Sequence, residues 1–177
     1  MRSLLVVLVA ATSVLGEVSF YEPGLTAGVA VAEIDSPTGI DMASDGTLYV
    51  GHGMRSSFLR ARIHRVRDGV VEPFGGVVVD PDAVVVDSED RVYVGTRRGG
   101  MFRILPDGTT GLFAPNQVVQ DGQTVNVLWN VDALTIDDDD RIYATSTIGN
   151  ALTRVDPDGS VRILREYPTA PKGLRFG

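Results

Sequence analysis

Three tyrosine-centred segments repeat along the chain, and this repeat restricts the fold more than any other feature of the sequence. Tyr49, Tyr93 and Tyr143 lie 44 and 50 residues apart, and the aligned segments cover residues 38–51, 82–95 and 132–145. Each segment reads as an apolar strand, a polar turn and a second β-rich strand. The turns fall at residues 44–46, 88–90 and 138–140.

A second hairpin follows each tyrosine. Its strands begin near Arg62, Met101 and Leu152, and its turns carry Asp-Gly at residues 68–69, 107–108 and 158–159. Asp-Gly between alternating stretches indicates a tight hairpin, and we expect both turn residues to have positive φ. Each repeat therefore predicts four short antiparallel strands.

Four strands in 40 to 50 residues are typical of one β-propeller blade. We predict an all-β fold class, with blades near residues 36–76, 77–125 and 126–167 and the start of a fourth at 168–177. No helix is expected, and residues 117–129 read as a long excursion between strands. Because propellers close with about four to eight blades, we expect a partial chain. The alternatives are closure by a partner or by self-assembly, and a tail that folds back.

Composition excludes several classes of function. The net charge is −7 and the pI is about 4.7, so the chain is a poor candidate for binding nucleic acid, which requires a basic face. It has no cysteine, which excludes disulfides, thiolate metal sites and a cysteine nucleophile. Two histidines are too few for a three-histidine zinc site.

The amino terminus is typical of an export signal. Met1-Arg2 precedes an uncharged run over residues 4–15, which suits a signal peptide and is short for a membrane span. We therefore predict a signal peptide at residues 1–16, a secreted or periplasmic location and no stable membrane span. The alternative is a buried first strand.

The repeat resembles known six-bladed propellers. Pro37-Thr38-Gly39 leads through an Asp-Gly turn to Tyr49-Val50, and Pro106-Asp107-Gly108 closes a later hairpin. This cadence is similar to the senescence marker protein/gluconolactonase and strictosidine synthase-like families and to NHL-repeat propellers. The resemblance implies about three blades of six. It also implies one divalent metal, usually calcium, in the central channel, with a lactone bound above it.

The position eleven residues before each repeat tyrosine supplies the candidate metal ligands. It holds Thr38, Asp82 and Asp132. In a propeller the start of the innermost strand faces the channel, so Asp82 and Asp132 would converge on one axis. Calcium takes several oxygen ligands, and Asn130 is a further candidate. The alternative is that each aspartate caps its own turn through the backbone. The resemblance implies Gly after the ligand and Glu in the first blade, whereas Ala83, Ala133 and Thr38 stand there.

Three other features are weaker candidates. His52 lies between two glycines, so it could line a pocket and act as a general base, or simply belong to a loop. His64 lies in an outer strand and is expected to be exposed. The acidic run 137–140 lacks the order and the late glutamate of a calcium loop, and we interpret it as a solvated turn.

Two classes of function follow. The first is an exported, metal-dependent lactonase or esterase in which Asp82 and Asp132 hold calcium, and the metal polarises the carbonyl of a small lactone or ester and activates water. The second is a non-catalytic propeller that binds a peptide, glycan or protein. Propellers host both classes, so the fold alone does not choose between them.

Overall fold

The computed structural model describes residues 34, 36–52 and 62–175. In this part of the chain all regular structure is β, and three four-stranded antiparallel sheets confirm the predicted all-β, propeller-like fold class. No helix long and apolar enough to cross a membrane occurs among the described residues. The predicted signal peptide at residues 1–16 lies outside them.

Each four-stranded sheet is one blade, and within it the strands follow one another in chain order. Blade 1 comprises β1 (Pro37–Met42), β2 (Leu48–His52), β3 (Arg62–Arg67) and β4 (Val70–Phe74). Blade 2 comprises β5 (Pro81–Val86), β6 (Val92–Thr96), β7 (Met101–Ile104) and β8 (Thr110–Ala114). Blade 3 comprises β11 (Val131–Ile136), β12 (Ile142–Ser146), β13 (Ala151–Val155) and β14 (Val161–Glu166).

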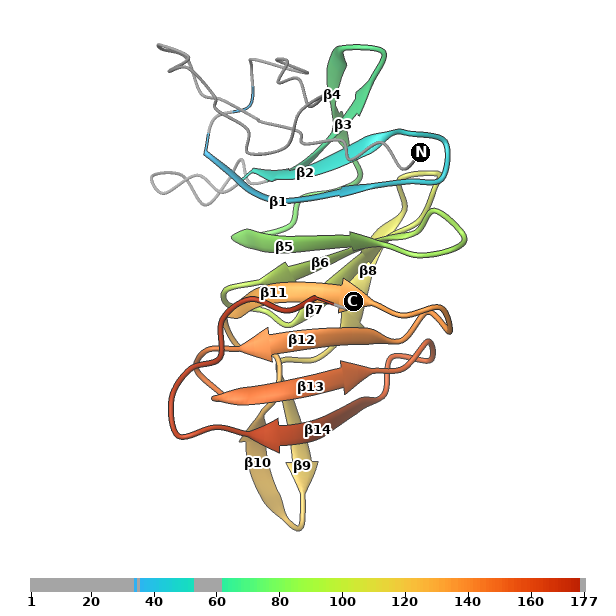
Figure 1. Cartoon of the computed structure of the whole chain (residues 1–177). Coiled ribbons are helices and arrows are strands. Elements are labelled where there is room, and N and C mark those ends of the chain that lie inside the picture. The colour runs from blue at the N-terminus through green and yellow to red at the C-terminus, as the bar shows by residue number, and fades with distance from the viewer. Residues whose placement is uncertain (1–33, 35, 53–61, 176–177) are drawn as a thin grey trace, which may run out of the picture.

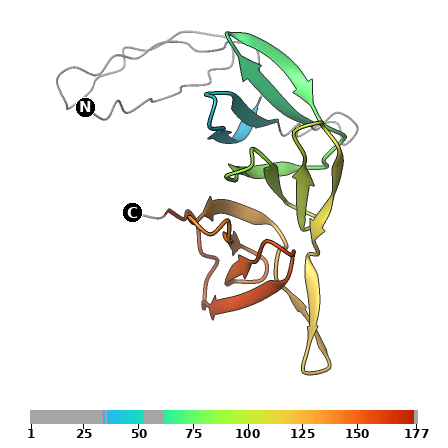
Figure 2. The same cartoon turned by 90° about the vertical axis from the view of Figure 1, so that its right-hand side faces the viewer.

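The blades pack face to face, with their first strands side by side. Figure 1 shows β5 between β1 and β11, and Figure 2 shows β4 and β8 on the side away from these inner strands. The turns that join the first strand of each blade to the second all lie at one end of the inner strands, because the three blades share one strand order and one twist. The loops that precede β5 and β11 lie at the opposite end.

Both faces of blade 2 are buried because its residues alternate between two cores. One side packs on blade 1 and includes Val84, Val86, Val92, Val94 and Ile104. The other side includes Ala83, Val85, Tyr93 and Met101, and packs on blade 3. This pattern explains why β5 and β6 are nearly continuous runs of apolar residues: a strand covered on both faces needs no polar alternation.

Two glycines in second strands, Gly51 in β2 and Gly95 in β6, allow the first strand of the next blade to approach closely. A Cβ built on Gly51 would lie 2.8 Å from Thr38 Oγ1 and 3.4 Å from Val84 Cγ2, and one built on Gly95 would lie 2.4 Å from Val131 Cγ1. Thr145 takes the same place in blade 3. Glycine is therefore needed at Gly51 and Gly95, the two positions that the next described blade covers.

The turns between the third and fourth strands differ from the prediction in two blades. In blade 1, Asp68 (φ 50°) and Gly69 (φ 77°) both have positive φ, as expected. In blades 2 and 3 only Gly108 and Gly159 do so. Pro106 favours the first turn position with negative φ, and Leu105 N–H donates to Thr109 O at 2.9 Å across a longer turn. The expectation that both residues have positive φ is therefore wrong for blades 2 and 3.

The predicted excursion after blade 2 contains a hairpin of its own. Strands β9 (Gln117–Gln120) and β10 (Gln123–Asn126) pair in antiparallel fashion, and Asp121 and Gly122 form the turn with φ 51° and 75°. The Asp121-Gly122 pair is the same hairpin signal used elsewhere in the chain. This hairpin projects beyond blade 3 in Figure 1 and accounts for the longer second interval of the repeat.

Candidate functional site

The predicted metal-ligand positions share an unusual backbone at the start of each inner strand. Asp80 and Asn130 have φ 51° and 57°, in the left-handed region that Asp and Asn tolerate best. Pairing then slips by one residue between Pro81 and Ala83, and between Val131 and Ala133. Asp82 and Asp132 are thus the extra residues of two equivalent β-bulges, and bulges commonly redirect a side chain. We name the end of the molecule that carries these bulges the strand-start face.

Asp82 forms an ion pair with Arg97, a residue that the spacing of the candidate metal ligands does not select. Arg97 donates from Nε to Asp82 Oδ2 and from Nη2 to Asp82 Oδ1, both at 3.1 Å. This two-point geometry matches the planar guanidinium to the carboxylate. The Asp82 side chain is 16% exposed and that of Arg97 is 50% exposed. The pair therefore lies at the mouth of the interface between inner strands and is accessible from solvent.

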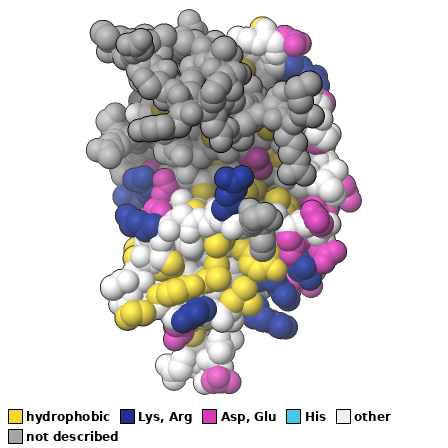
Figure 3. Space-filling view, in the orientation of Figure 1, with side chains coloured by type: hydrophobic (Ala, Val, Ile, Leu, Met, Phe, Trp, Pro, Cys, Tyr) yellow, Lys and Arg dark blue, Asp and Glu magenta, His cyan; other side chains and the backbone are white. Residues whose placement is uncertain are grey.

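Further charges surround this pair. Hydrogen bonding to Asp82, with the negative charges of Asp82, Asp80 and Asp132, raises the pKa of Arg97 above its usual value. Arg98 pairs with Asp80 at 3.2 Å. Figure 3 shows positive and negative side chains gathered on the left of the molecule, the end at which β5 and β11 begin. Asp82 is therefore paired with a guanidinium whose pKa Asp132 also raises, and the convergence of Asp82 and Asp132 on a metal ion stays a prediction.

Asn130 has a structural place beside this cluster. Its backbone carbonyl accepts from Thr147 N–H at 3.0 Å and from Thr147 Oγ1 at 3.1 Å. Its side-chain Nδ2 also donates to Thr147 Oγ1. The backbone N–H of Asn130 donates to Arg97 O at 3.1 Å. Asn130 therefore links the loops of blades 2 and 3. Among the described residues, no group of three or more His, Cys, Asp or Glu side chains has the arrangement of a metal site.

His52 lies apart from this cluster, on the side of blade 1 that faces away from blade 2. Its residue is 8% exposed, and its ring meets that of His64 edge to face with centroids 5.4 Å apart. His64 was expected to be exposed and is instead half-buried. Burial, then the neighbouring His52 and Arg62, lowers the pKa of His64. The two histidines thus form a packed pair, and His52 does not join Asp82 or Asp132.

The acidic run 137–140 does form a turn, although two of its carboxylates have specific partners. Asp137 Oδ2 accepts from Arg141 Nε at 2.7 Å and from Tyr143 Oη at 3.1 Å. Asp140 accepts from the N–H and Oγ of Ser88 at 3.0 and 2.7 Å, which ties the turn of blade 3 to that of blade 2. The solvated-turn interpretation therefore fits the exposed Asp138 and Asp139 and is too simple for Asp137 and Asp140.

Two features could have been found from the sequence. The pattern Asp-x-x-x-Arg-x-Tyr occurs at Asp87 and again at Asp137, and it builds the same hydrogen-bonded network in both blades. Arg97 lies one position after Thr96, which aligns with His52. An arginine immediately after the second strand faces the strand-start end, so the same alignment that selected Asp82 also points to Arg97.

Comparison with known proteins supports the fold. A crystal structure of a catalytically inactive virginiamycin B lyase from Staphylococcus aureus with quinupristin matches with a TM-score of 0.56 and 20% identity over 75% of this chain. A streptogramin B lyase structure matches with a TM-score of 0.56 and 15% identity over 76% of this chain. The chain is part of a β-propeller. It spans 42% of each matching lyase, and virginiamycin B lyase is seven-bladed.

Neither a family model nor a curated protein matches the sequence. At 15 and 20% identity the likeness to the two lyases concerns the fold alone. The predicted propeller architecture is thereby confirmed, and the total number of blades in the closed ring stays a prediction.

Proposed function

We propose that this chain is part of a non-catalytic β-propeller that binds a peptide, glycan or protein at its strand-start face. The observation that carries the proposal is the two-point pair between Arg97 and Asp82. Because its carboxylate is already paired with a guanidinium, Asp82 is a weaker candidate for a calcium ligand. The exposed arginine itself is a ready donor for a partner.

Surface composition at this end supports the same proposal. Val77, Val79 and Ile148 lie in the loops around Arg97 and Arg98, and they are 47%, 40% and 55% exposed. Exposed aliphatic side chains next to arginine are typical of protein-binding surfaces, where arginine is enriched and supplies both packing and hydrogen bonds. Glycans could use the same donors through their hydroxyl groups.

The experiment is a screen of the whole chain against immobilised peptide and glycan libraries of known composition. The double variant Arg97→Gln/Arg98→Gln is the matched control, because it keeps a polar side chain at each position and removes both charges. We expect ligands that bind the parent and lose at least about tenfold in affinity in the variant, as for a charge-assisted hydrogen bond. Equal binding by parent and variant would overturn the proposed face.

A calcium-dependent hydrolase of a lactone or ester is the second candidate. It is favoured by one observation: Asp82 and Asp132 emerge from equivalent bulges on adjacent inner strands, and both influence Arg97. Calcium would need both carboxylates, with Asn130 as a further oxygen ligand and Arg97 displaced. His52 as general base has no support from its position against His64.

Calcium distinguishes the two candidates. If the binding proposal is right, millimolar calcium leaves the melting temperature of the whole chain unchanged. A rise of several degrees that Asp132→Asn abolishes would instead favour the metal-dependent enzyme. The lyase activity of the matching structures forms no part of either proposal, because the likeness to them concerns the fold alone.

Export is a separate proposal, resting on the uncharged run that follows Met1-Arg2. A secreted or periplasmic location suits a chain that has no cysteine to oxidise. Fractionation of the native source, with mass analysis of the amino terminus, tests it. We expect the mature chain to begin at Glu17, and an intact Met1 in a cytosolic fraction would overturn export.

A further inference from the structure

The same arginine position is occupied in all three blades, but its surroundings differ in blade 2. Arg65, Arg103 and Arg154 each lie opposite the repeat tyrosine on the neighbouring strand. In blades 1 and 2 the guanidinium also stacks on an aromatic ring, at 5.1 Å from Phe74 and at 4.9 Å from Phe113. The repeat thus places one cation at an equivalent point of every blade.

Blades 1 and 3 supply a carboxylate to this cation. Glu72 lies opposite Arg65 on β4 and accepts from its Nε at 2.9 Å. In blade 3, Arg154 Nη2 donates to Asp156 Oδ2 at 3.1 Å. In blade 2 the residue opposite Arg103 is Gly111, and the equivalent of Asp156 is Leu105. Among the described residues, Arg103 forms no ion pair with a carboxylate.

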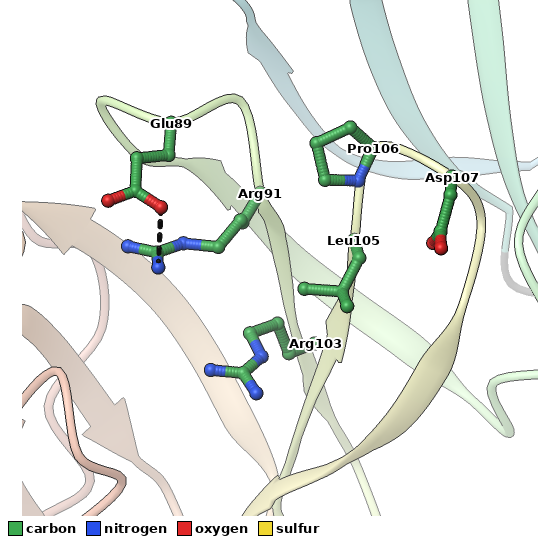
Figure 4. A pocket seen from close by; sticks show the side chains of 6 residues that line it. All are labelled: Glu89, Arg91, Arg103, Leu105, Pro106 and Asp107. Carbon is green, nitrogen blue, oxygen red and sulfur yellow. Dashed lines mark ion pairs between the residues drawn. The ribbon is translucent and has the colours of Figure 1, made fainter.

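A pocket opens beside Arg103 and Leu105. It has a volume of about 460 Å³ and is lined by Glu89, Arg91, Arg103, Leu105, Pro106 and Asp107. Figure 4 shows the guanidinium groups of Arg91 and Arg103 projecting to the same side, with Leu105 close to Arg103. The pocket lies at the turn end of the blades, opposite the strand-start face, so it is independent of the function proposed above.

Among the described residues that line the pocket, Arg103 is the cation without a carboxylate partner, although its guanidinium also contacts Tyr93 and Phe113. Arg91 is already paired with Asp87 at 2.5 Å and with Glu89 at 2.9 Å. Asp107 accepts from Thr109 N–H at 2.8 Å, and this bond lowers its pKa, so it stays ionised. Asp107 is exposed at the rim, where water screens its repulsion of a single negative charge. A ligand with two negative charges would be disfavoured more strongly.

From this geometry we propose that the pocket between Arg103, Leu105 and Pro106 binds a monocarboxylate that carries a small branched apolar group. The carboxylate accepts hydrogen bonds from Arg103, as Glu72 does from Arg65 in blade 1, while the apolar group packs on Leu105 and Pro106. Such a group is present both in a free branched-chain acid and at the carboxyl terminus of a peptide that ends in valine or leucine.

The test uses the whole chain with isovalerate and N-acetylvaline as separate probes, and isovaleramide as the uncharged analogue. Calorimetry or NMR titration measures binding. We expect at least one acid to bind and the amide to bind at least tenfold more weakly, since charged hydrogen bonds contribute about 1.5–3 kcal/mol. Preference for isovalerate identifies a free acid, and preference for N-acetylvaline identifies a peptide terminus.

Two variants localise the binding. Arg103→Gln should weaken it at least tenfold. Gly111→Glu should block it by supplying the carboxylate internally, and it should keep or raise the melting temperature; a Cβ at Gly111 meets no atom within 4 Å. Gly111→Ala is the matched control and should bind as the parent does. The proposal is overturned if neither acid binds, if the amide binds equally well, or if Gly111→Glu binds as tightly as Gly111→Ala.

Discussion

The turns of blades 2 and 3 contain the same hydrogen-bonded network in two different environments. Asp87 accepts from Glu89 N–H, Arg91 N–H, Arg91 Nε and Tyr93 Oη at 3.0, 2.9, 2.5 and 3.0 Å. Asp137 accepts from the equivalent four groups at 3.0, 2.9, 2.7 and 3.1 Å. The side chain of Asp87 is 0% exposed and that of Asp137 is 15% exposed.

The difference arises from the neighbouring blade. Blade 3 covers the tyrosine side of blade 2, so Tyr93 is 2% exposed within the core between them. Tyr143 lies on the opposite side of blade 3, over which no further blade lies among the described residues. Local sequence therefore builds the network, and the adjacent blade decides how deeply it is buried and how much its loss should cost.

Removing the carboxylate should separate the two sites by the largest margin. Asp87→Ala leaves the Arg91 guanidinium and the Tyr93 hydroxyl without their buried partner, and we expect the free energy of unfolding to fall by about 3–5 kcal/mol. Asp137→Ala should cost only about 1–2 kcal/mol, because water reaches the groups it leaves behind. Urea denaturation of the two variants measures both values.

Matched isosteric variants control this comparison. Asp87→Asn and Asp137→Asn keep the side-chain volume and one acceptor oxygen, and each should be less destabilising than the corresponding alanine variant. If Asp87→Ala and Asp137→Ala cost the same, the covering blade does not determine the value of the network.

Moving blade 3 away from blade 2 should have the next largest effect. Gly95→Ala places a Cβ 2.4 Å from Val131 Cγ1, so β6 and β11 must shift relative to each other, and we expect the free energy of unfolding to fall by about 1–3 kcal/mol. Gly111→Ala is the control at an open position. Hydrogen exchange should show faster exchange of β11 amides in Gly95→Ala only, whereas unchanged exchange would mean that the interface adapts without opening.

Much of this architecture could be predicted from sequence because it depends on local patterns. The tyrosine repeat, the Asp-Gly turns and the apolar strands specify four-stranded blades through neighbouring residues alone. Asp121-Gly122 is the same hairpin signal, but residues 117–129 were interpreted as a long excursion between strands, and the β9–β10 hairpin was missed. The Pro106-Asp107-Gly108 turn was mistaken because proline fixes its own φ and so lengthens the turn.

The candidate site was less predictable because its chemistry depends on contacts between loops. Asp82 and Asp132 were located correctly at the inner-strand starts, whereas the Arg97 guanidinium reaches Asp82 from a residue 15 positions later. A spacing argument for metal ligands considers carboxylates and omits the cations that can satisfy them. The flanking glycines of His52 suggested a pocket-lining residue or a simple loop, whereas its ring packs against that of His64 on the next strand.

The pH dependence of stability at alkaline pH should also show that the blade 2 network is buried, and its expected effect on stability is smaller. Burial first, and then the charge of Asp87, raises the pKa of Tyr93 from 10.0 to about 12. In the unfolded chain this tyrosine loses its proton near pH 10, while the folded chain keeps it. The contribution to stability is therefore complete below pH 10 and is lost as the pH rises from about 10 to 12.

Tyrosine absorbance and NMR titration of the Tyr93 ring measure this shift. Asp87→Asn should lower the pKa of Tyr93, because the negative charge that opposes ionisation is gone. A Tyr93 pKa near 10 in the folded parent would contradict the buried environment assigned to blade 2.

The smallest expected effect concerns the link between the two turns. Ser88→Ala removes the hydrogen bond from Oγ to Asp140 at 2.7 Å and keeps the backbone bond to the same carboxylate at 3.0 Å. Ser88 is exposed and Asp140 only half-buried, so the cost should be about 0.5–1 kcal/mol. Ser44→Ala is the matched control, because its Oγ lies 3.2 Å from Asp90 in the preceding pair of turns. Thermal denaturation should rank Ser88→Ala as the more destabilising of the two. The reverse order would mean that the Ser44–Asp90 contact between blades 1 and 2 contributes more to stability than the Ser88–Asp140 contact between blades 2 and 3. The longer hydrogen bond would then belong to the more firmly packed interface.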